Sequence, residues 1–364
     1  MWKSKRPRRS DFSTLSLRLW DFTGMALLNL FVWLAALIYL SPLTYMFITS
    51  VKTSEQLSDS SAPILPARPV MYEYEGRARY VYYVPTESGT RQLALIDSDR
   101  NGAFFIDPQD PEAGLIRWEG SWRTLRRVYS PHWEFGNFVT LWERIEYPRL
   151  LRNTLILVFL GEVGVLASSI AVAYGFSRFR IPGGKYLFLL LIATIMIPDS
   201  ITLVPTFFIY ANLLDWLRSF TSTSAIYYIP LLLPHFFGSA IYIFLLRQNF
   251  KAIPRDLDEA AMIDGASPLR ILVSIILPQA VPTVVTVGLL HFFNAWNEMR
   301  MASLFLGVSQ ERTIGFSAQA FQSYGFTPEF LQASALMLMI IPILVLFLAQ
   351  RFFMQDMVVT GIEK

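Results

Sequence analysis

The sequence predicts an all-α polytopic membrane protein with six transmembrane helices and a small, mainly β extracytoplasmic insertion between the first and second helices. Two observations predict this class. Of the 364 residues, 53% are hydrophobic and only 16% are charged, with a mean hydropathy of +0.40, whereas soluble domains carry about 25% charged residues. In addition, several uncharged apolar runs reach about 20 residues, the length at which a helix crosses a bilayer.

In lipid, only α-helices and closed β-barrels satisfy the hydrogen bonds of the backbone. We expect these runs to be helices because they are too long and too evenly apolar for barrel strands. The first run follows the basic head MWKSKRPRRS. It exceeds the roughly 7–15 apolar residues of a cleaved signal peptide, so it is expected to stay in the membrane. The six expected spans are residues 23–50, 153–176, 186–210, 225–246, 277–296 and 330–350.

Basic residues in the short connections predict the orientation of the spans. The N-terminal tail, the loop SRFRIPGGK (177–185) and the loop after the fourth span are all basic. With six spans, these three segments lie on one side of the membrane, and basic short loops mark the cytoplasm. Both termini are therefore expected in the cytoplasm and the long connection after the first span outside it.

These spans divide the chain into five expected parts. Within the long connection, YEYEGRARYVYYV (72–84) and RQLALI (91–96) are expected strands, separated by turn signals. The alternative is an irregular capping loop, although connections above about 15 residues without structure are uncommon. The parts are a basic cytoplasmic tail (1–22), the first span (23–50), the extracytoplasmic insertion (51–151), a five-helix core with a cytoplasmic loop at 247–278 (152–352) and a cytoplasmic tail (353–364).

The loop after the fourth span carries signals for two short helices. Pro254 suits a first helical turn, and the acidic residues of RDLDEAAMID complement the positive end of a helix dipole. Gly265 is placed to end this helix in the left-handed conformation. Ser267 and Pro268 then fit the N-cap and first position of a second helix. The loop is thus predicted to be a helix–turn–helix at the cytoplasmic face.

Several kinds of chemistry are excluded by the sequence. There is no cysteine, so disulfides, thiolate metal sites and cysteine nucleophiles are ruled out. No phosphate-binding G-x-x-x-x-G-K-S/T run and no H-E-x-x-H zinc motif occur, and the basic residues form no stripe suited to nucleic acid. We therefore expect a non-catalytic chain that binds no metal or cofactor.

The spacing within this loop carries a family resemblance. Glu259, Ala260 and Ala261 are followed by Gly265 and then by Ile275-x-Leu277-Pro278. This arrangement resembles the cytoplasmic loop of the membrane subunits in binding-protein-dependent ABC importers, and the chain is most similar to the shorter permease of maltose-type carbohydrate systems. The resemblance runs from about Leu28 to the C-terminus, apart from the external insertion. The segment 61–130 is longer than such subunits usually carry, and the end GIEK is a variant of a more glycine-rich tail.

The resemblance implies a function and a set of partners. Such a chain pairs with a second permease subunit in a bacterial or archaeal cytoplasmic membrane, engages an ABC ATPase dimer that holds ATP and Mg, and receives a sugar or oligosaccharide from an extracytoplasmic solute-binding protein. The insertion is expected to dock the binding protein or the partner permease. The residues that the resemblance assigns to ATPase coupling are Asp258, Glu259, Ala260, Ala261, Asp264, Gly265 and Ala266.

Polar residues within the spans are candidates for the solute pathway, because burying them in lipid is costly. Glu162 and His235 either line this pathway or form hydrogen bonds between helices. Asn294, Trp296 and Asn297, near the outer end of the fifth span, have the chemistry to meet a sugar. The alternative for Trp296 is the ordinary aromatic belt at the membrane interface.

Other functions stay open at this stage. One alternative is an importer permease for a non-sugar solute such as a glycerol phosphate, a polyol or an amino acid. Another is an ATP-independent channel or secondary transporter. The scarcity of paired charges within the spans, and the lack of a visible inverted repeat, count against a secondary transporter.

Overall fold

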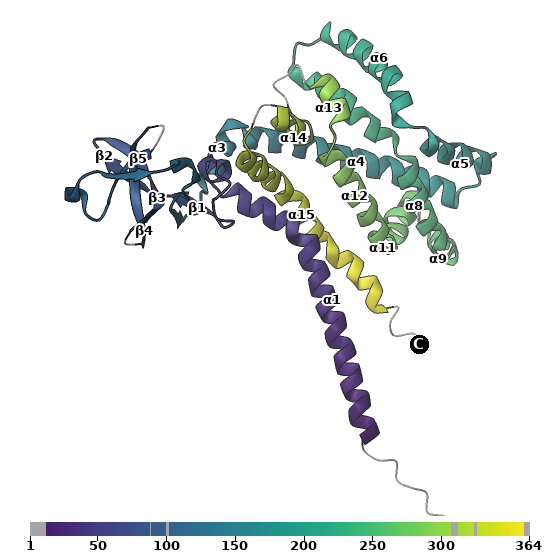
Figure 1. The fold of residues 1–364 in the computed structure, drawn as a ribbon. Helices are drawn as coiled ribbons and strands as arrows, with labels where there is room; N and C mark the ends of the chain where they lie inside the picture. Colours follow the sequence, from purple (N-terminus) through teal and green to yellow (C-terminus); the bar gives the residue numbers. More distant parts are fainter. Residues whose placement is uncertain (1–11, 88, 100–101, 307–311, 324–325, 360–364) are drawn as a thin grey trace, which may run out of the picture. The chain divides into compact units, whose positions relative to one another are not determined.

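A computed structural model describes residues 12–87, 89–99, 102–306, 312–323 and 326–359 (Figure 1). The chain forms two compact units, Met1–Phe135 and Gly136–Lys364. Residues 136–151 thus belong with the helical unit, whereas the sequence analysis placed them in the insertion. Residues 1–11 of the expected N-terminal tail and the GIEK end lie outside the described residues.

The first unit begins with the long helix α1 (Phe12–Ser50), which continues into the short helix α2 (Ser54–Ser58). The part Gly24–Ser50 is apolar and long enough to cross a membrane. Its side chains up to residue 47 are mostly exposed, Tyr39 by 84% and Ile38 by 73%. This is the surface that a helix in contact with lipid or another chain presents, and the expected first span is present.

The rest of the first unit is a small β structure. Five antiparallel strands pair in the order β2-β3-β4-β5-β6, and β1 pairs with β7. Neighbouring residues such as Val81 and Tyr82, or Ala94 and Leu93, pack into two separate clusters, because successive side chains point to opposite faces of a sheet. The strands are β1 (Ala67–Pro69), β2 (Met71–Tyr74), β3 (Arg77–Thr86), β4 (Gly89–Ser98), β5 (Gly102–Ile106), β6 (Ile116–Glu119) and β7 (Tyr129–Pro131).

The expected single strand at 72–84 is two strands. Glu75 and Gly76 both have positive φ angles, 50° and 73°, and Tyr74 pairs with Arg77 across them. Positive φ at both central residues is the conformation of a type I′ hairpin turn. The sequence prediction was wrong here because the alternation of apolar and polar residues continues through the turn.

The second unit is helical, and α4 is its central element. It packs against α8 and α12, and α12 also packs against α15. The helices are α3 (Gly136–Arg144), α4 (Tyr147–Arg178), α5 (Gly184–Ala193), α6 (Asp199–Arg218), α7 (Ile229–Leu232), α8 (Ala240–Ala252), α9 (Asp256–Ile263), α10 (Pro268–Ile271), α11 (Leu277–Gln279), α12 (Val281–Trp296), α13 (Arg300–Phe305), α14 (Ile314–Ser323) and α15 (Pro328–Val359).

Three of the predicted spans are broken rather than continuous. The third span is interrupted at Ile197. The backbone of Ile197 is extended because the ring of Pro198 disfavours a helical conformation in the residue before it. The fourth passes through the 3-10 turn η5 (Leu233–Phe237) and is interrupted at Gly238, where φ is 76°. The fifth is bent by 83° between residues 279 and 281. Within the described residues, five helices are long and apolar enough to cross a membrane, or six if this bent pair is one span.

The largest apolar cluster of this unit joins α4, α8 and the segment that follows α9. Leu246 and Phe250 of α8 and Ile271 and Ile276 beyond α9 are fully buried in it. The predicted cytoplasmic loop is therefore attached through its apolar side chains to the bundle. This attachment positions the candidate site.

Candidate coupling site and transmembrane polar cluster

The helix α9 is short and mostly exposed. Its first turn holds three acidic residues, as the sequence predicts. On its surface, Leu257 is exposed by 41%, Met262 by 57% and Ile263 by 87%. Exposed apolar side chains beside carboxylates on a rigid helix are the features of a protein-docking surface.

Both ends of the turn after α9 are built as predicted. Gly265 has a φ of 79°. The Ala266 N–H donates to the Ala261 carbonyl and the Gly265 N–H to the Met262 carbonyl, which is the Schellman arrangement that ends a helix. Ser267 then caps α10, its side chain accepting from the Arg270 N–H.

A buried ion pair fastens α9 to the end of α4. Nε of Arg178 lies 2.8 Å from Oδ2 of Asp258, and the two side chains are exposed by only 6% and 8%. Arg178 also donates from Nη2 to the Ile253 carbonyl at 3.1 Å. The Tyr174 hydroxyl donates to the Pro268 carbonyl at 3.0 Å. Because α4 contacts the loop before, within and after α9, the end of α4 and this loop form one body.

The predicted coupling residues separate into three groups by burial. Asp258 faces inward, held by Arg178, so it is an anchor within the chain rather than part of the exposed surface. Ala261 and Ala266 are half-buried. The remaining four predicted coupling residues are exposed: Glu259, Ala260, Asp264 and Gly265.

A second polar group lies within the spans. Oε2 of Glu162, on α4, is 2.7 Å from Nδ1 of His291, on α12. Nε2 of His291 is in turn 3.2 Å from Nδ1 of His235, on η5. His291 is 1% exposed, whereas His235 is half-buried. The structure thus joins the two predicted residues Glu162 and His235 through a third residue.

Glycines make this close approach possible. A Cβ at Gly161 would lie 3.0 Å from the His235 ring and 3.2 Å from the His291 ring, and a Cβ at Gly164 would lie 3.0 Å from the Phe236 ring. A Cβ at Gly288 would lie 2.8 Å from Oε1 of Glu162. Larger residues at these positions would push η5 or α12 away from α4.

Two serines of α4 hold the backbone on either side of the Gly238 break. The Ser168 hydroxyl donates to the His235 carbonyl, and the Ser239 N–H donates to the Ser169 hydroxyl, each at 3.3 Å. These bonds satisfy backbone groups that the interrupted helix leaves free. The break in the fourth span is therefore a supported feature of the fold.

His291 was missed by the sequence analysis, although a signal for it existed. It is an ionisable residue in the middle of the apolar run LLHFFNAW, and such residues are rarely without a role in a membrane span. Beside it, Glu162 lines an otherwise apolar groove of about 360 Å³ between α4, α12 and α15.

The other predicted pathway residues lie at the end of α12. Trp296 is 3% exposed and stacks on Phe292, with ring centroids 5.6 Å apart. One face of its ring is therefore already covered. Asn294 and Asn297 are exposed. Asn297 borders two open cavities of about 550 and 520 Å³, of which Trp296 lines the first and Asn294 the second.

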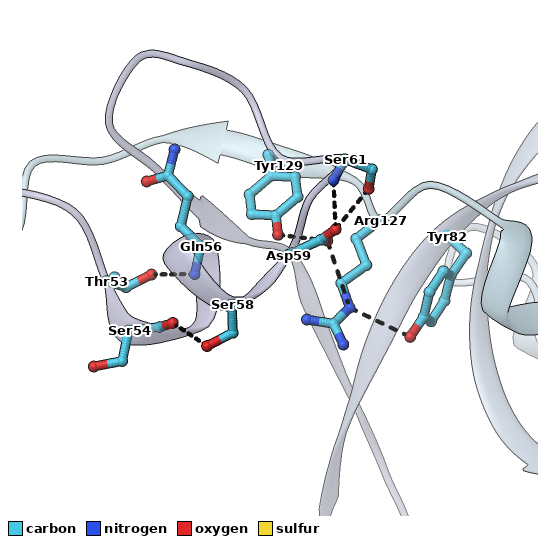
Figure 2. Close-up of polar contacts among 9 residues, drawn as sticks. All are labelled: Thr53, Ser54, Gln56, Ser58, Asp59, Ser61, Tyr82, Arg127 and Tyr129. Atoms are coloured by element: carbon cyan, nitrogen blue, oxygen red, sulfur yellow. Dashed lines mark hydrogen bonds and ion pairs between the residues drawn. The ribbon is translucent and has the colours of Figure 1, made fainter. Parts of the chain in front are cut away.

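In the first unit, a polar network ties the segment after α1 to the β structure (Figure 2). Asp59 accepts hydrogen bonds from the Tyr129 hydroxyl at 2.8 Å and the Ser61 hydroxyl at 2.7 Å. Arg127 lies 3.9 Å from the same carboxylate and 3.4 Å from the Tyr82 hydroxyl. Burial raises the pKa of Asp59, but the hydrogen bonds from Ser61 and Tyr129 and the charge of Arg127 outweigh it, so the pKa lies below its ordinary value.

Gln56 supports this network from α2. Its side chain is buried, donates to the carbonyls of Pro63 and Leu65 and accepts from the Ala67 N–H. All of its hydrogen-bonding groups face the chain that leads into β1. Together with Asp59, Gln56 makes the passage from α1 to the sheet a folded connection rather than a flexible linker.

Several apolar spans, breaks supported by side chains, and ionisable groups buried within the spans define a multi-pass membrane transport protein. Comparisons with known proteins give the family. Residues 164–362 match the model described as "Binding-protein-dependent transport system inner membrane component". The chain belongs to this family, which confirms the resemblance found in the sequence. It is therefore a permease subunit that contributes to a translocation pathway.

Individual relatives agree with this assignment. The osmoprotective compounds uptake permease protein of Synechocystis sp. is 30% identical over 77% of this chain and 92% of its own length. The trehalose/maltose transport system permease protein of Thermococcus litoralis is 30% identical over 60% of this chain and 72% of its own length. Among solved structures, a bacterial ABC transporter involved in the import of the acidic polysaccharide alginate matches with a TM-score of 0.58 and 19% identity, over 96% of this chain and 100% of that chain. This last similarity concerns the fold alone.

Proposed function

We propose that the chain imports a sugar or oligosaccharide as one permease of an ATP-driven transporter, in which α9 docks on a separate ATPase subunit. ATP and Mg are held by that subunit, and this chain is neither an ATPase nor a binder of a metal or cofactor. The carbohydrate substrate is supported by relatives named for sugar transport, such as the trehalose/maltose permease.

The observation that carries the proposal is the combination of exposure and anchoring at α9. Its outer surface, with Glu259, Met262 and Ile263, is free to enter a partner. Its inner surface is clamped to α4 through Asp258 and Arg178. A helix that is both exposed and rigidly attached transmits a partner's movement, because displacement of α9 must displace the end of α4.

The helix α4 extends this connection into the membrane. Glu162 lies sixteen residues before Arg178 on the same helix, about 24 Å at 1.5 Å per residue. We propose that closure of the ATPase dimer pushes α9 and tilts α4. The tilt then shifts α12 and η5, which pack on it. Alternation between two rigid packings of this kind is a general way to open a cavity to one side and then the other.

The remaining partners and the orientation complete the proposal. A second permease subunit forms the other half of the pathway, and an extracytoplasmic solute-binding protein delivers the solute to the side that carries the β unit. Both termini are cytoplasmic, and the membrane is the bacterial or archaeal cytoplasmic membrane. Asn294 and Asn297 are the residues proposed to meet sugar hydroxyls, because their amide groups are exposed beside open cavities.

The test uses charge reversal on the exposed surface of α9. Glu259→Lys is expected to leave the chain in the membrane but to abolish both co-purification of the ATPase and ATP-driven sugar uptake in proteoliposomes. Glu143→Lys is the control, because Glu143 is also an exposed acid but lies on another helix, α3. Normal co-purification and uptake in Glu259→Lys would refute the docking site. ATP-driven uptake of a glycerol phosphate or polyol in place of every sugar tried would refute the substrate class alone.

A further inference from the structure

Glu162, His291 and His235 form a continuous polar chain of three ionisable side chains, which helix packing alone does not require. Its three members come from α4, α12 and η5, and its two links are 2.7 and 3.2 Å long. Of the remaining ionisable groups that the structure describes, only Tyr242 of α8 faces it, with ring centroids of Tyr242 and His291 6.3 Å apart. No described lysine or arginine pairs with Glu162. Among the described residues, only the two histidines of this polar chain can therefore compensate the negative charge of Glu162.

The two hydrogen-bonded links are compatible with two protonation states of the group. Each link needs one proton between its two heavy atoms. If each histidine is neutral, His291 donates from Nδ1 to Glu162 and accepts at Nε2 from His235, and the group carries a net charge of −1. If one proton is added at Nε2 of His235 and the Nδ1 proton of His235 passes to Nε2 of His291, then His291 donates from Nδ1 to Glu162 and from Nε2 to His235, and the net charge is zero. Both links are satisfied in either state, so the difference is one proton and one unit of charge.

The apolar surroundings of Glu162 make the two protonation states differ in free energy. A lone carboxylate is costly to bury among apolar side chains, whereas a carboxylate beside an imidazolium is compensated and gains a charge-assisted hydrogen bond. Histidines change charge between about pH 5 and 8. Protonation of a histidine in this group would therefore change how well the charge of Glu162 is compensated.

The two ends of the polar chain are accessible, although its middle is not. Glu162 lines the apolar groove of about 360 Å³, and His235 is half-buried on the other side of His291, which is 1% exposed. A proton can therefore bind at Nε2 of His235, and the Nδ1 proton of His235 can pass to Nε2 of His291, without rearrangement of the fold.

We propose that Glu162, His291 and His235 form a binding site for one exchangeable proton, centred on His291, whose occupancy sets how firmly η5 is held against α4 and α12. With the proton bound, the cationic His291 bridges Glu162 and His235. Without it, the group is left with an uncompensated, partly buried carboxylate, which favours entry of water and loosening of the break at Gly238. The effect on import rests on the proposed function, whereas the proton site itself does not.

The first experiment addresses the proton site on the full chain in lipid nanodiscs. Histidine nitrogens are labelled with ¹⁵N, and their NMR signals are followed between about pH 5 and 8. The chain has three histidines, and His132, in the first unit and 40% exposed, serves as an internal reference. We expect His291 to pass from two protonated nitrogens at low pH to one at high pH. In Glu162→Gln we expect one protonated nitrogen throughout.

An unchanged His291 signal across the range in the wild-type chain would overturn the proposal, as would the same titration in Glu162→Gln. If Glu162→Gln fails to fold, His235→Gln provides the same test at the more accessible end of the chain. There the Nε2 signal of His291 is expected to change while Nδ1 keeps its bond to Glu162. An unaltered Nε2 signal would overturn the proposal equally.

The second experiment measures ATP-driven uptake in proteoliposomes of the assembled transporter as a function of pH. The wild type and His132→Gln are expected to share one pH profile, whereas Glu162→Gln and His235→Gln lose this pH dependence. Identical profiles in all four would overturn the link between the proton and transport. Absence of ATP-driven uptake in every protein, with the NMR titration present, would refute the proposed function and leave the proton site standing.

Discussion

Arg178 ends the long helix α4, and its guanidinium lies 2.8 Å from the carboxylate of Asp258 in the first turn of α9, with both side chains more than nine-tenths buried. The pair joins a membrane-spanning helix to a short exposed helix that is far from it in the sequence. Burying two charges is expensive, so such a pair is weak evidence of stability by itself. The pair lies between a docking surface and the transmembrane bundle. This position indicates that it fixes the orientation of α9 relative to the end of α4.

Asp258→Asn tests this anchor. The change leaves the Arg178 charge buried without its counter-ion, which costs about 3–5 kcal/mol. We expect a lower thermal unfolding temperature of the purified chain, and ATP hydrolysis in the assembled transporter that no longer drives uptake.

Asp215→Asn is the matched control for this substitution. Asp215 and Arg218 lie 2.7 Å apart, but their side chains are 68% and 50% exposed, and such a solvent-screened surface pair contributes little to stability. Equal losses of thermal stability in the two variants would show that the buried Arg178–Asp258 pair contributes no more to stability than an exposed pair.

A pair of glycines tests the turn that ends α9. Neither Gly265 nor Gly175 has an atom within 4 Å of the position of an added Cβ, but only Gly265 has a positive φ, of 79°. Gly265→Ala is therefore expected to cost about 1–2 kcal/mol from backbone strain alone and to weaken ATPase co-purification. Gly175→Ala, inside α4, is expected to gain about 0.5–1 kcal/mol. The measurement is thermal unfolding of both variants, and a neutral Gly265→Ala would contradict the account of the turn.

The comparison of sequence and structure shows which features local signals determine. The left-handed Gly265 and the capping Ser267 were predicted because a cap depends on a few neighbouring residues. The partner of Asp258 was not predicted, because Arg178 lies on another helix and only the folded chain brings the two together. For the same reason Asp258 was assigned to ATPase coupling without its link to α4.

The nature of the interruptions in the spans could not be predicted, for a different reason. A window of hydropathy averages over the interruptions at Pro198 and Gly238, and a proline in a span is compatible with either a kink or an end. His291 was overlooked because its role is apparent only when Glu162 and His235 are seen on either side of it. Glu162 and His235 were thus singled out from the sequence, but the connection between them was not.

The absence of cysteine from the sequence allows a direct test of orientation. Glu112→Cys, on the exposed turn η1 (Pro111–Ala113) of the β unit, is expected to react with a membrane-impermeant maleimide in intact cells. Lys185→Cys, exposed at the start of α5, is expected to react only after the membrane is permeabilised. Labelling of Lys185→Cys in intact cells, or protection of Glu112→Cys, would reverse the proposed topology.

The polar network around Asp59 predicts a pH dependence for the first unit (Figure 2). Because the pKa of Asp59 is lower in the folded chain than its ordinary value, its contribution to stability is fully present above about pH 4 and is lost as the pH falls through the lowered pKa. Hydrogen exchange of β1 and β7 in the full chain is therefore expected to show opening at acid pH. Asp59→Asn should remove this dependence relative to the wild type measured at the same pH.

Tyr129→Phe separates one bond of the network from the rest. It removes the 2.8 Å hydrogen bond to Asp59 and keeps the ring, so we expect a loss of about 1–2 kcal/mol in the opening free energy of the same strands. Asp110→Asn, at an exposed position of the same unit, is expected to have no effect. A Tyr129→Phe chain as protected as the wild type would show that the network does not hold α2 to the sheet.

The central claim is that α9 enters the ATPase subunit, and site-specific photocrosslinking measures it most directly. A photoreactive amino acid replaces Ile263, which is 87% exposed on α9, or Ile64, which is 82% exposed in the first unit. The account predicts that illumination of the assembled transporter crosslinks position 263 to the ATPase and that position 64 gives no such product. A crosslink from position 64 to the ATPase, or none from position 263 in a transporter that hydrolyses ATP and imports its solute, would contradict it.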